Sequence, residues 1–156
     1  MSSLITPSIA AYFDAAVIPL RLACDTYSGW PFVLSLWFLH EEGRLLCATN
    51  ASARVVSYLR REPRCAFEVA ADDPPYCGVR GQALAQVDPL RGEEVLRRLL
   101  ARYLGGEDSA LAQRLLARRH EEVAIVLTPV NLFTWNFTRR MQDVAPLRGK
   151  PCPPPT

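Results

Sequence analysis

The segment Thr49-Asn-Ala-Ser-Ala-Arg54 combines residue types that could bind a phosphate group. It follows a short apolar run and precedes a helical pattern, so we expect it at a helix N-terminus, where unpaired N–H groups and a partial positive charge favour anions. Thr49 and Ser52 would add hydroxyl donors, and the guanidinium of Arg54 can bind two phosphate oxygens at once. An ordinary helix cap formed by Asn50, with Arg54 in solvent, has the same pattern, so both interpretations stay open.

Other reactive patterns are scarce in the sequence. It contains no G-x-S-x-G, H-E-x-x-H or P-loop motif, so nothing supports hydrolysis. We expect no metal site, because the five cysteines form no C-x-x-C pair and only His40 and His120 could join them. We expect both histidines at the surface, with His40 in a turn. Most of the cysteines lie in apolar runs, as in proteins of reducing compartments, which predicts a cytoplasmic protein.

Composition narrows the class of protein further. The chain has 156 residues, about half of them apolar, which predicts one domain with a substantial core. A net charge of +2 does not favour nucleic-acid binding. The longest mainly apolar stretch, Phe32–Leu39, is too short to span a membrane, and no basic lead typical of a signal peptide precedes the first apolar residues. We predict a single domain over residues 1–142 and a disordered proline-rich tail over residues 143–156.

The pattern of apolar residues predicts seven short strands and four helices. Thr6-Pro7 marks the first helix, and Gly105 would end the helix that begins at Asp88-Pro89. Short links between the first three strands imply antiparallel pairing, and strands this short in one domain favour a closed or nearly closed barrel. The helices are expected at 6–16, after 50, 88–105 and 109–119, and the strands at 17–24, 32–39, 45–49, 65–71, 76–87, 123–130 and 132–138.

The order and spacing of four motifs resemble the pyridoxamine 5′-phosphate oxidase-like family of flavin-binding split barrels. The resemblance covers residues 8 to 140, and it implies a mainly β fold with flanking helices, a six- to seven-stranded antiparallel split barrel. It also implies a homodimer with two cofactor sites at the interface. The motifs are Phe32-Val-Leu-Ser-Leu-Trp-Phe38, the segment Gly43–Arg54, Leu59-Arg-Arg-Glu-Pro-Arg-Cys-Ala66, and Val79-Arg-Gly-Gln-Ala83.

The resemblance also implies where an FMN cofactor would lie. The flavin ring would contact the backbone of the second strand, which a plain core strand would match equally well, and the phosphate would lie at the segment discussed first. Trp135 and Arg139 would reach the cofactor of the partner subunit. The C-terminal signature of true oxidases is absent, which argues against pyridoxamine 5′-phosphate as the substrate. The implied cofactor-binding residues are Val33, Leu34, Ser35, Leu36, Thr49, Asn50, Ser52, Arg54, Trp135 and Arg139.

The resulting hypothesis is a flavin (FMN)-binding oxidoreductase that acts on an unidentified small molecule, with no nucleic-acid or membrane partner. One alternative keeps the fold and binds a deazaflavin (coenzyme F-420), whose acidic tail would use the arginines at 60, 61 and 64. These arginines also suit a solvated helix end. Another alternative is a protein that binds a flavin or haem without turnover.

Overall fold

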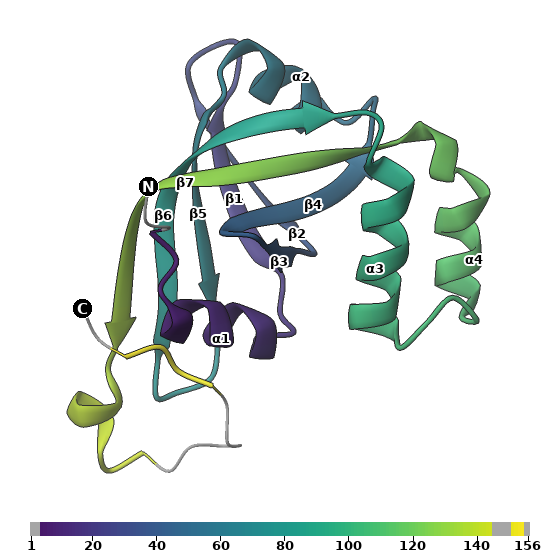
Figure 1. Ribbon diagram of the computed structural model, residues 1–156. Coiled ribbons are helices and arrows are strands. Elements are labelled where there is room, and N and C mark those ends of the chain that lie inside the picture. Colours follow the sequence, from purple (N-terminus) through teal and green to yellow (C-terminus); the bar gives the residue numbers. More distant parts are fainter. Residues whose placement is uncertain (1–3, 145–150, 155–156) are drawn as a thin grey trace.

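A seven-stranded antiparallel sheet organises the chain in the computed structural model, which describes residues 4–144 and 151–154 (Figure 1). Its strand order is β2-β1-β5-β6-β7-β4-β3. The strands are β1 (Leu20–Asp25), β2 (Pro31–Leu36), β3 (Leu39–Glu41), β4 (Arg44–Asn50), β5 (Arg64–Ala70), β6 (Cys77–Asp88) and β7 (Glu122–Asn136).

The two ends of this sheet are joined through only two residues. β2 pairs with β1 and β3 pairs with β4, yet β2 and β3 follow each other in the chain, so Trp37 and Phe38 link the opposite edges. The predicted single strand Phe32–Leu39 is therefore wrong, because it breaks into two. This link curls the sheet into the antiparallel barrel that the sequence predicted.

Tyr103 explains why the strand breaks at this point. Its hydroxyl group donates a hydrogen bond to the Ile18 carbonyl oxygen (2.9 Å) and accepts one from the Phe38 N–H (3.2 Å). Its ring stacks on Trp37 with 5.0 Å between ring centroids. A backbone N–H that bonds to a side chain cannot also pair with a neighbouring strand, so the break depends on a residue 65 positions away.

The last strand also differs from its prediction. The sequence indicated two strands, 123–130 and 132–138, but β7 is continuous and pairs with both β4 and β6. Its register against β6 shifts at one point, where Asn131 faces Gln82 and Pro129 faces Ala83. Val130 is left without an opposite residue, which is a β-bulge. The bulge and Pro129 interrupt the pattern of apolar residues, which is why the sequence indicated two strands.

Glycine at position 81 allows close strand contact beside this bulge. A Cβ atom there would lie 2.5 Å from the Asn131 carbonyl oxygen. Glycines inside a strand often mark a bulge or a close approach of another backbone, and both occur here.

Four helices of the described residues cover the barrel, and their ends follow local signals. The Thr6 side chain accepts a hydrogen bond from the Ile9 N–H, and Gly105 ends the third helix with a φ of 75°. That helix begins at Gly92 rather than at Asp88-Pro89, because Asp88 accepts a hydrogen bond from the Leu90 N–H and forms a turn. None of the helices in these residues is long and apolar enough to cross a membrane. They are α1 (Pro7–Ala15), α2 (Arg54–Arg61), α3 (Gly92–Leu104) and α4 (Ala110–Ala117), with 3₁₀ turns η1 (Arg119–Glu121) and η2 (Thr138–Met141).

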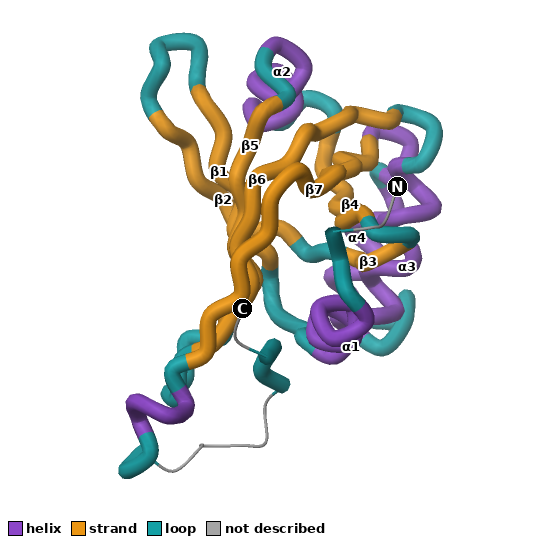
Figure 2. The backbone as a smooth tube through the Cα atoms, turned by 60° about the vertical axis from the view of Figure 1, so that its left-hand side comes forward, coloured by secondary structure: helices purple, strands orange, loops and turns teal. Residues whose placement is uncertain are grey.

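The helices lie on different sides of the barrel. Figure 1 shows α1 below the strands, α2 above them, and α3 and α4 side by side next to β4 and the start of β7. Figure 2 shows the β1–β2 hairpin beside α2, and the far ends of β6 and β7 extending in the opposite direction. The main core fills the barrel, whereas Leu46, Val126 and Leu99 belong to a second core between the sheet and α3. The middle of β4 and the first half of β7 are thus buried on both faces.

The cysteines divide into two groups. Cys24, Cys47 and Cys65 are free and buried, as expected of small apolar residues. Cys77 and Cys152 form a disulfide, whereas the sequence had indicated cysteine usage typical of a reducing compartment.

This disulfide lies where residues 151–154 contact the sheet. The Thr134 hydroxyl donates to the Pro154 carbonyl oxygen (2.7 Å) and the Asn136 side chain donates to the Pro153 carbonyl oxygen (3.1 Å). Residues 145–150 and 155–156 of the predicted disordered tail lie outside the described residues. Disorder of the tail as a whole therefore stays a prediction.

Candidate functional site

A cavity of about 350 Å³ lies where β2 and the end of β4 meet the start of β7 and the two helices α3 and α4. Its volume is in the range of small-molecule sites, which combine apolar walls with a few polar groups. Leucines from both helices and the Trp37 ring form its apolar wall. The polar residues that line it are Ser35, Thr49, Asn50 and Glu122.

The side chain of Asn50 organises the turn between β4 and α2. Its oxygen Oδ1 accepts hydrogen bonds from the Ser52 N–H (2.9 Å) and the Ser52 hydroxyl (2.6 Å). Its amide Nδ2 donates to Oε2 of Glu121 (2.9 Å). Asn50 is therefore a turn-forming residue four positions before the first residue of the helix, rather than the helix cap that the sequence suggested.

The N-terminus of α2 is open. Its N-cap residue is Ala53, and no side chain of the described residues bonds to the first N–H groups there. Arg54 is the first helical residue and is exposed, and its side chain has no hydrogen bond or ion pair within residues 4–144 and 151–154. A free guanidinium at an uncapped helix start is suited to bind an anion.

The candidate residues of β2 separate into three environments. Ser35 and Leu36 line the cavity with Thr49 and Asn50. Leu34 packs against the core of the barrel. Val33 is 63% exposed and lines a second cavity, of about 440 Å³, on the outer face of the sheet. Side chains alternate along a strand, so only part of this segment can face one ligand.

Trp135 and Arg139 lie far from this cavity within the chain. Trp135 is thirteen residues from Glu122 along β7, which is roughly 40 Å of extended strand. Its Nε1 is buried without a hydrogen-bond partner in the described residues, and its ring packs against Phe137 with 5.4 Å between centroids. Arg139 is exposed in η2. Neither can contribute to the cavity of its own chain.

Glu122 is a functional candidate that sequence reasoning missed, because it stands beside other charges at a helix end. Burial raises the pKa of its carboxyl group; Arg118 lowers it and Glu121 raises it further. Glu121 has the opposite shift, because hydrogen bonds from Arg118 and Asn50 lower its pKa. The only sequence signal for Glu122 is an acidic residue directly before a buried strand.

His40 lies in β3 instead of in a surface turn, so that prediction is wrong. Its side chain is only 13% exposed, and Nδ1 lies 3.2 Å from Oδ1 of Asp14. The turn is formed by Glu42 and Gly43, which follow the end of β3 at Glu41 and both have positive φ. His120 is exposed, as predicted. No group of three or more His, Cys, Asp or Glu side chains in the described part of the chain could hold a metal ion.

Two arginines of the proposed tail-binding cluster have partners within the chain. The Arg61 side chain donates to the Thr26 carbonyl oxygen (2.7 Å) and lies over the Tyr27 ring. Arg64 forms two hydrogen bonds with Glu62 (2.8 and 2.9 Å). Arg60 is exposed, and it has no such partner among the described residues.

Comparisons with known proteins support the fold. No family model matches the sequence, and a search of curated proteins found no match. Among solved structures, the conserved hypothetical protein Rv2991 from Mycobacterium tuberculosis has a TM-score of 0.73 at 20% identity, over 95% of this chain and 91% of that one. An F420 reductase has 0.64 at 21% identity, over 77% and 92%. A candidate pyridoxamine 5′-phosphate oxidase from Listeria innocua has 0.61 at 19% identity, over 81% and 94%.

These likenesses show that the chain has the split-barrel fold of pyridoxamine 5′-phosphate oxidase-like proteins, as its motifs predicted. Proteins described as haem-binding share the fold as well. One fold can therefore hold different cofactors, and the choice among them has to come from the residues of the site.

Proposed function

We propose that the chain is an FMN-binding oxidoreductase that acts on a small molecule. The observation that carries this proposal is the pairing of an apolar cavity with an unpartnered arginine. The cavity has polar groups at one end, and Arg54 follows Asn50 by four residues at an open helix start. A flat ring with a polar rim fits the cavity, and a phosphate fits the helix start.

The residues of the chain would bind and orient the flavin, and the flavin would supply the transfer of hydride or electrons. Ser35 and Leu36 would flank the ring. Ser52 and Arg54 would bind the phosphate, with Thr49 between the two ends. Leucines of α3 and α4 would exclude water from the ring.

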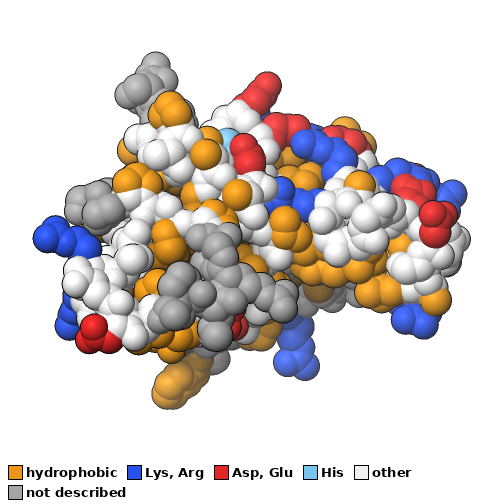
Figure 3. Space-filling view, turned by 90° about the horizontal axis from the view of Figure 1, so that it is seen from below, with side chains coloured by type: hydrophobic (Ala, Val, Ile, Leu, Met, Phe, Trp, Pro, Cys, Tyr) orange, Lys and Arg blue, Asp and Glu red, His pale blue; other side chains and the backbone are white. Residues whose placement is uncertain are grey.

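We further propose a homodimer that forms through the outer face of the sheet. Val33 and Phe133 are 63% and 50% exposed, and both line the 440 Å³ cavity there. Covering such side chains with a second copy would remove apolar surface from water. In Figure 3 hydrophobic side chains lie across the whole view, and charged ones are most numerous toward the side of α3 and α4. A dimer could bring Trp135 and Arg139 to the site of the partner.

A cytoplasmic location is also part of the proposal. The Cys77–Cys152 disulfide weighs against it, because such bonds persist mainly in oxidising compartments. Cell fractionation, with thiol labelling of the protein under native conditions, would decide between a cytoplasmic location and an oxidising compartment.

A deazaflavin is the second candidate cofactor, since an F420 reductase has a similar fold. The structure offers fewer unpaired arginines to the acidic tail of a deazaflavin than the sequence suggested. Arg61 and Arg64 already have partners, so Arg60 is the member of that cluster without one in the described residues.

The visible absorption spectrum of the purified protein, before and after addition of FMN, tests the proposal first. We expect paired flavin bands that stay with the protein after excess FMN is removed. Retention of a deazaflavin but not FMN would favour the second candidate, and a haem spectrum without turnover would favour a binding protein.

Arg54→Ala tests the phosphate site directly. We expect FMN binding to weaken by on the order of 1.5–3 kcal/mol, the range for hydrogen bonds to charged groups, as measured by fluorescence titration. Arg60→Ala is the matched control, because it removes another exposed arginine from the same helix and should leave the FMN dissociation constant unchanged. Equal constants for wild type and Arg54→Ala would remove Arg54 from the site.

A further inference from the structure

The position of Glu122 is fixed by its backbone. It is the first residue of β7 and faces Asn50 of β4 in the antiparallel register. Gly92, at the start of α3, packs directly against it, since a Cβ atom at position 92 would lie 1.9 Å from the Glu122 carbonyl oxygen. Two elements therefore hold this residue at the polar end of the cavity.

The Glu122 side chain has no internal partner. It lines the cavity, and no hydrogen bond or ion pair to it exists within residues 4–144 and 151–154. β4 contributes Thr49 and Asn50 beside it, and α3 and α4 contribute only leucines to the cavity. The charged groups that act on it are Arg118 and Glu121, and these two already form an ion pair with each other.

We propose that Glu122 determines the charge of the ligand group that this cavity accepts, favouring a neutral group with an N–H or O–H donor next to Thr49 and Asn50 and disfavouring an anionic one. The inference rests on the proposed function and deepens it. The neutral ring of a flavin would occupy the cavity, and its phosphate would lie at the polar end, near Ser52 and Arg54. Ser52 bonds to Asn50, the residue opposite Glu122, so the charge of Glu122 would act on that phosphate. A substrate that shares the cavity would be uncharged at this end.

The physical reason is the cost of a partly buried carboxylate that has no internal partner in the described residues. An ionised group loses hydration there, and a donor from a ligand restores part of what is lost. A second negative charge nearby adds repulsion that little solvent screens. The raised pKa of Glu122 agrees with these surroundings.

Glu122→Gln, which keeps the shape and removes the charge, tests the inference with two ligands. FMN and riboflavin differ by the phosphate group, so the ratio of their dissociation constants reports how the site treats negative charge. We expect Glu122→Gln to shift this ratio about fivefold to tenfold in favour of FMN at pH 7.5, measured by fluorescence titration. Asp108→Asn, which removes an equally negative but exposed charge from the α3–α4 loop, should leave the ratio unchanged.

A pH series on the wild-type protein provides a second measurement that needs no substitution. The wild-type ratio should approach that of Glu122→Gln as the pH falls and Glu122 becomes protonated. The Gln variant serves as the reference at each pH, because the phosphate of FMN also titrates near pH 6.

The outcomes distinguish a failure of the inference about Glu122 from a failure of the proposed function. Flavin binding with the same ratio in wild type and Glu122→Gln, at every pH, would overturn the inference and leave the proposed function standing. Failure of the wild-type protein to bind either flavin would overturn the proposed function, and the inference would fall with it.

Discussion

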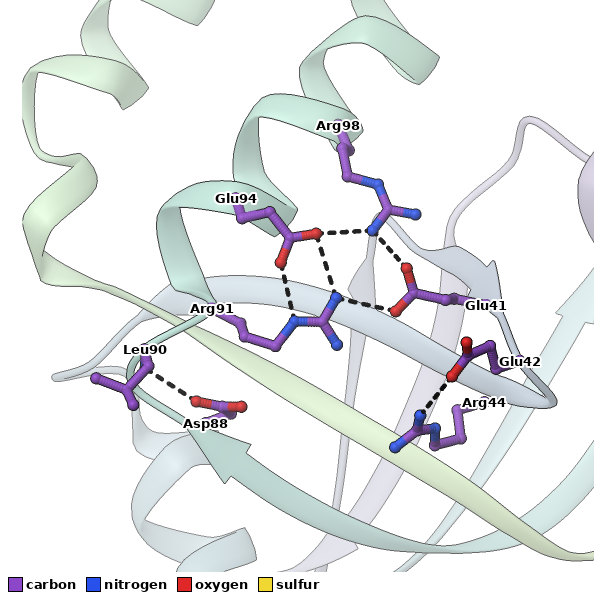
Figure 4. Close-up of polar contacts among 8 residues, drawn as sticks. All are labelled: Glu41, Glu42, Arg44, Asp88, Leu90, Arg91, Glu94 and Arg98. Carbon is purple, nitrogen blue, oxygen red and sulfur yellow. Dashed lines mark hydrogen bonds and ion pairs between the residues drawn. The ribbon is translucent and has the colours of Figure 1, made fainter.

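Two helices of the molecule begin in opposite ways. α2 begins at Arg54, whose charge has no partner in the described residues. α3 begins at Gly92, whose Cα lies against the backbone of Glu122, and the arginines of this region are paired with glutamates (Figure 4). Arg91 contacts Glu41 and Glu94 (both 2.9 Å), and Arg98 contacts the same two carboxylates (2.7 and 2.8 Å).

The difference separates charges that hold the fold from charges that are free to bind. These four side chains connect α3 to the β3–β4 hairpin. Their hydrogen-bonding groups are therefore already occupied by contacts within the protein. Nothing comparable occupies the start of α2. If this interpretation is correct, substitutions at the start of α3 and in its charged network should affect folding. Substitution of Arg54 at the start of α2 should affect ligand binding alone.

The largest effect is expected for Gly92→Ala. The new Cβ atom would lie 1.9 Å from a backbone oxygen that cannot move without disturbing β7. We expect the free energy of unfolding to fall by about 3 kcal/mol, measured by urea denaturation.

Gly29→Ala is the control for this prediction. Gly29 has a φ of 79° but nothing within 4 Å of an added Cβ, so only the backbone strain of about 1 kcal/mol should appear. Equal losses in the two variants would show that α3 has room at its start, and the contrast with α2 would disappear.

The local part of this contrast could be predicted from the sequence. Thr6-Pro7 and Gly105 mark helix ends because their effects depend only on neighbouring residues. The segment from Thr49 to Arg54 was identified for the same reason. Contacts between residues far apart in the chain produced no such signal in the sequence. The break after Leu36 depends on Tyr103, and His40 lies against Phe13 and Asp14 of α1.

The residues of the candidate site also divide into those that the sequence predicted and those whose position depends on contacts between distant segments. Ser35, Leu36, Thr49 and Asn50 line one cavity, because the link through Trp37 and Phe38 brings β2 close to the β4 edge of the sheet. Their role in binding a cofactor stays a prediction. Glu122 could not be predicted, since its role comes from the register that places it opposite Asn50. Whether Trp135 reaches a partner's site depends on an assembly that one chain does not contain.

A smaller effect is expected for Glu41→Gln. Glu41 is 26% exposed and accepts hydrogen bonds from both Arg91 and Arg98, which hold its pKa below the usual value. We expect a loss of about 1 kcal/mol in unfolding free energy at pH 7. A lowered folded-state pKa gives stability above the unfolded value, near 4.3, that is lost as the pH falls through the folded value. The difference between wild type and Glu41→Gln should therefore shrink below about pH 4.3.

Glu42→Gln provides the matched control for the neighbouring carboxylate. Its side chain is 78% exposed and bonds to Arg44 alone, so urea denaturation should show a change within about 0.5 kcal/mol at any pH. A loss as large as that of Glu41→Gln would mean that general surface charge, rather than the paired network, stabilises this region.

The smallest effect on folding is expected for Arg54→Ala. Its side chain contacts no partner within the described residues, and alanine and arginine have similar helix propensities, so unfolding free energy should change by less than about 0.5 kcal/mol. Arg98→Ala, which removes two ion pairs from a helix of the same chain, should cost more in the same urea titration. A substantial loss in Arg54→Ala would reveal a structural role for this arginine. A negligible loss would mean that its position at an open helix start serves something other than the fold, as binding of an anionic ligand requires.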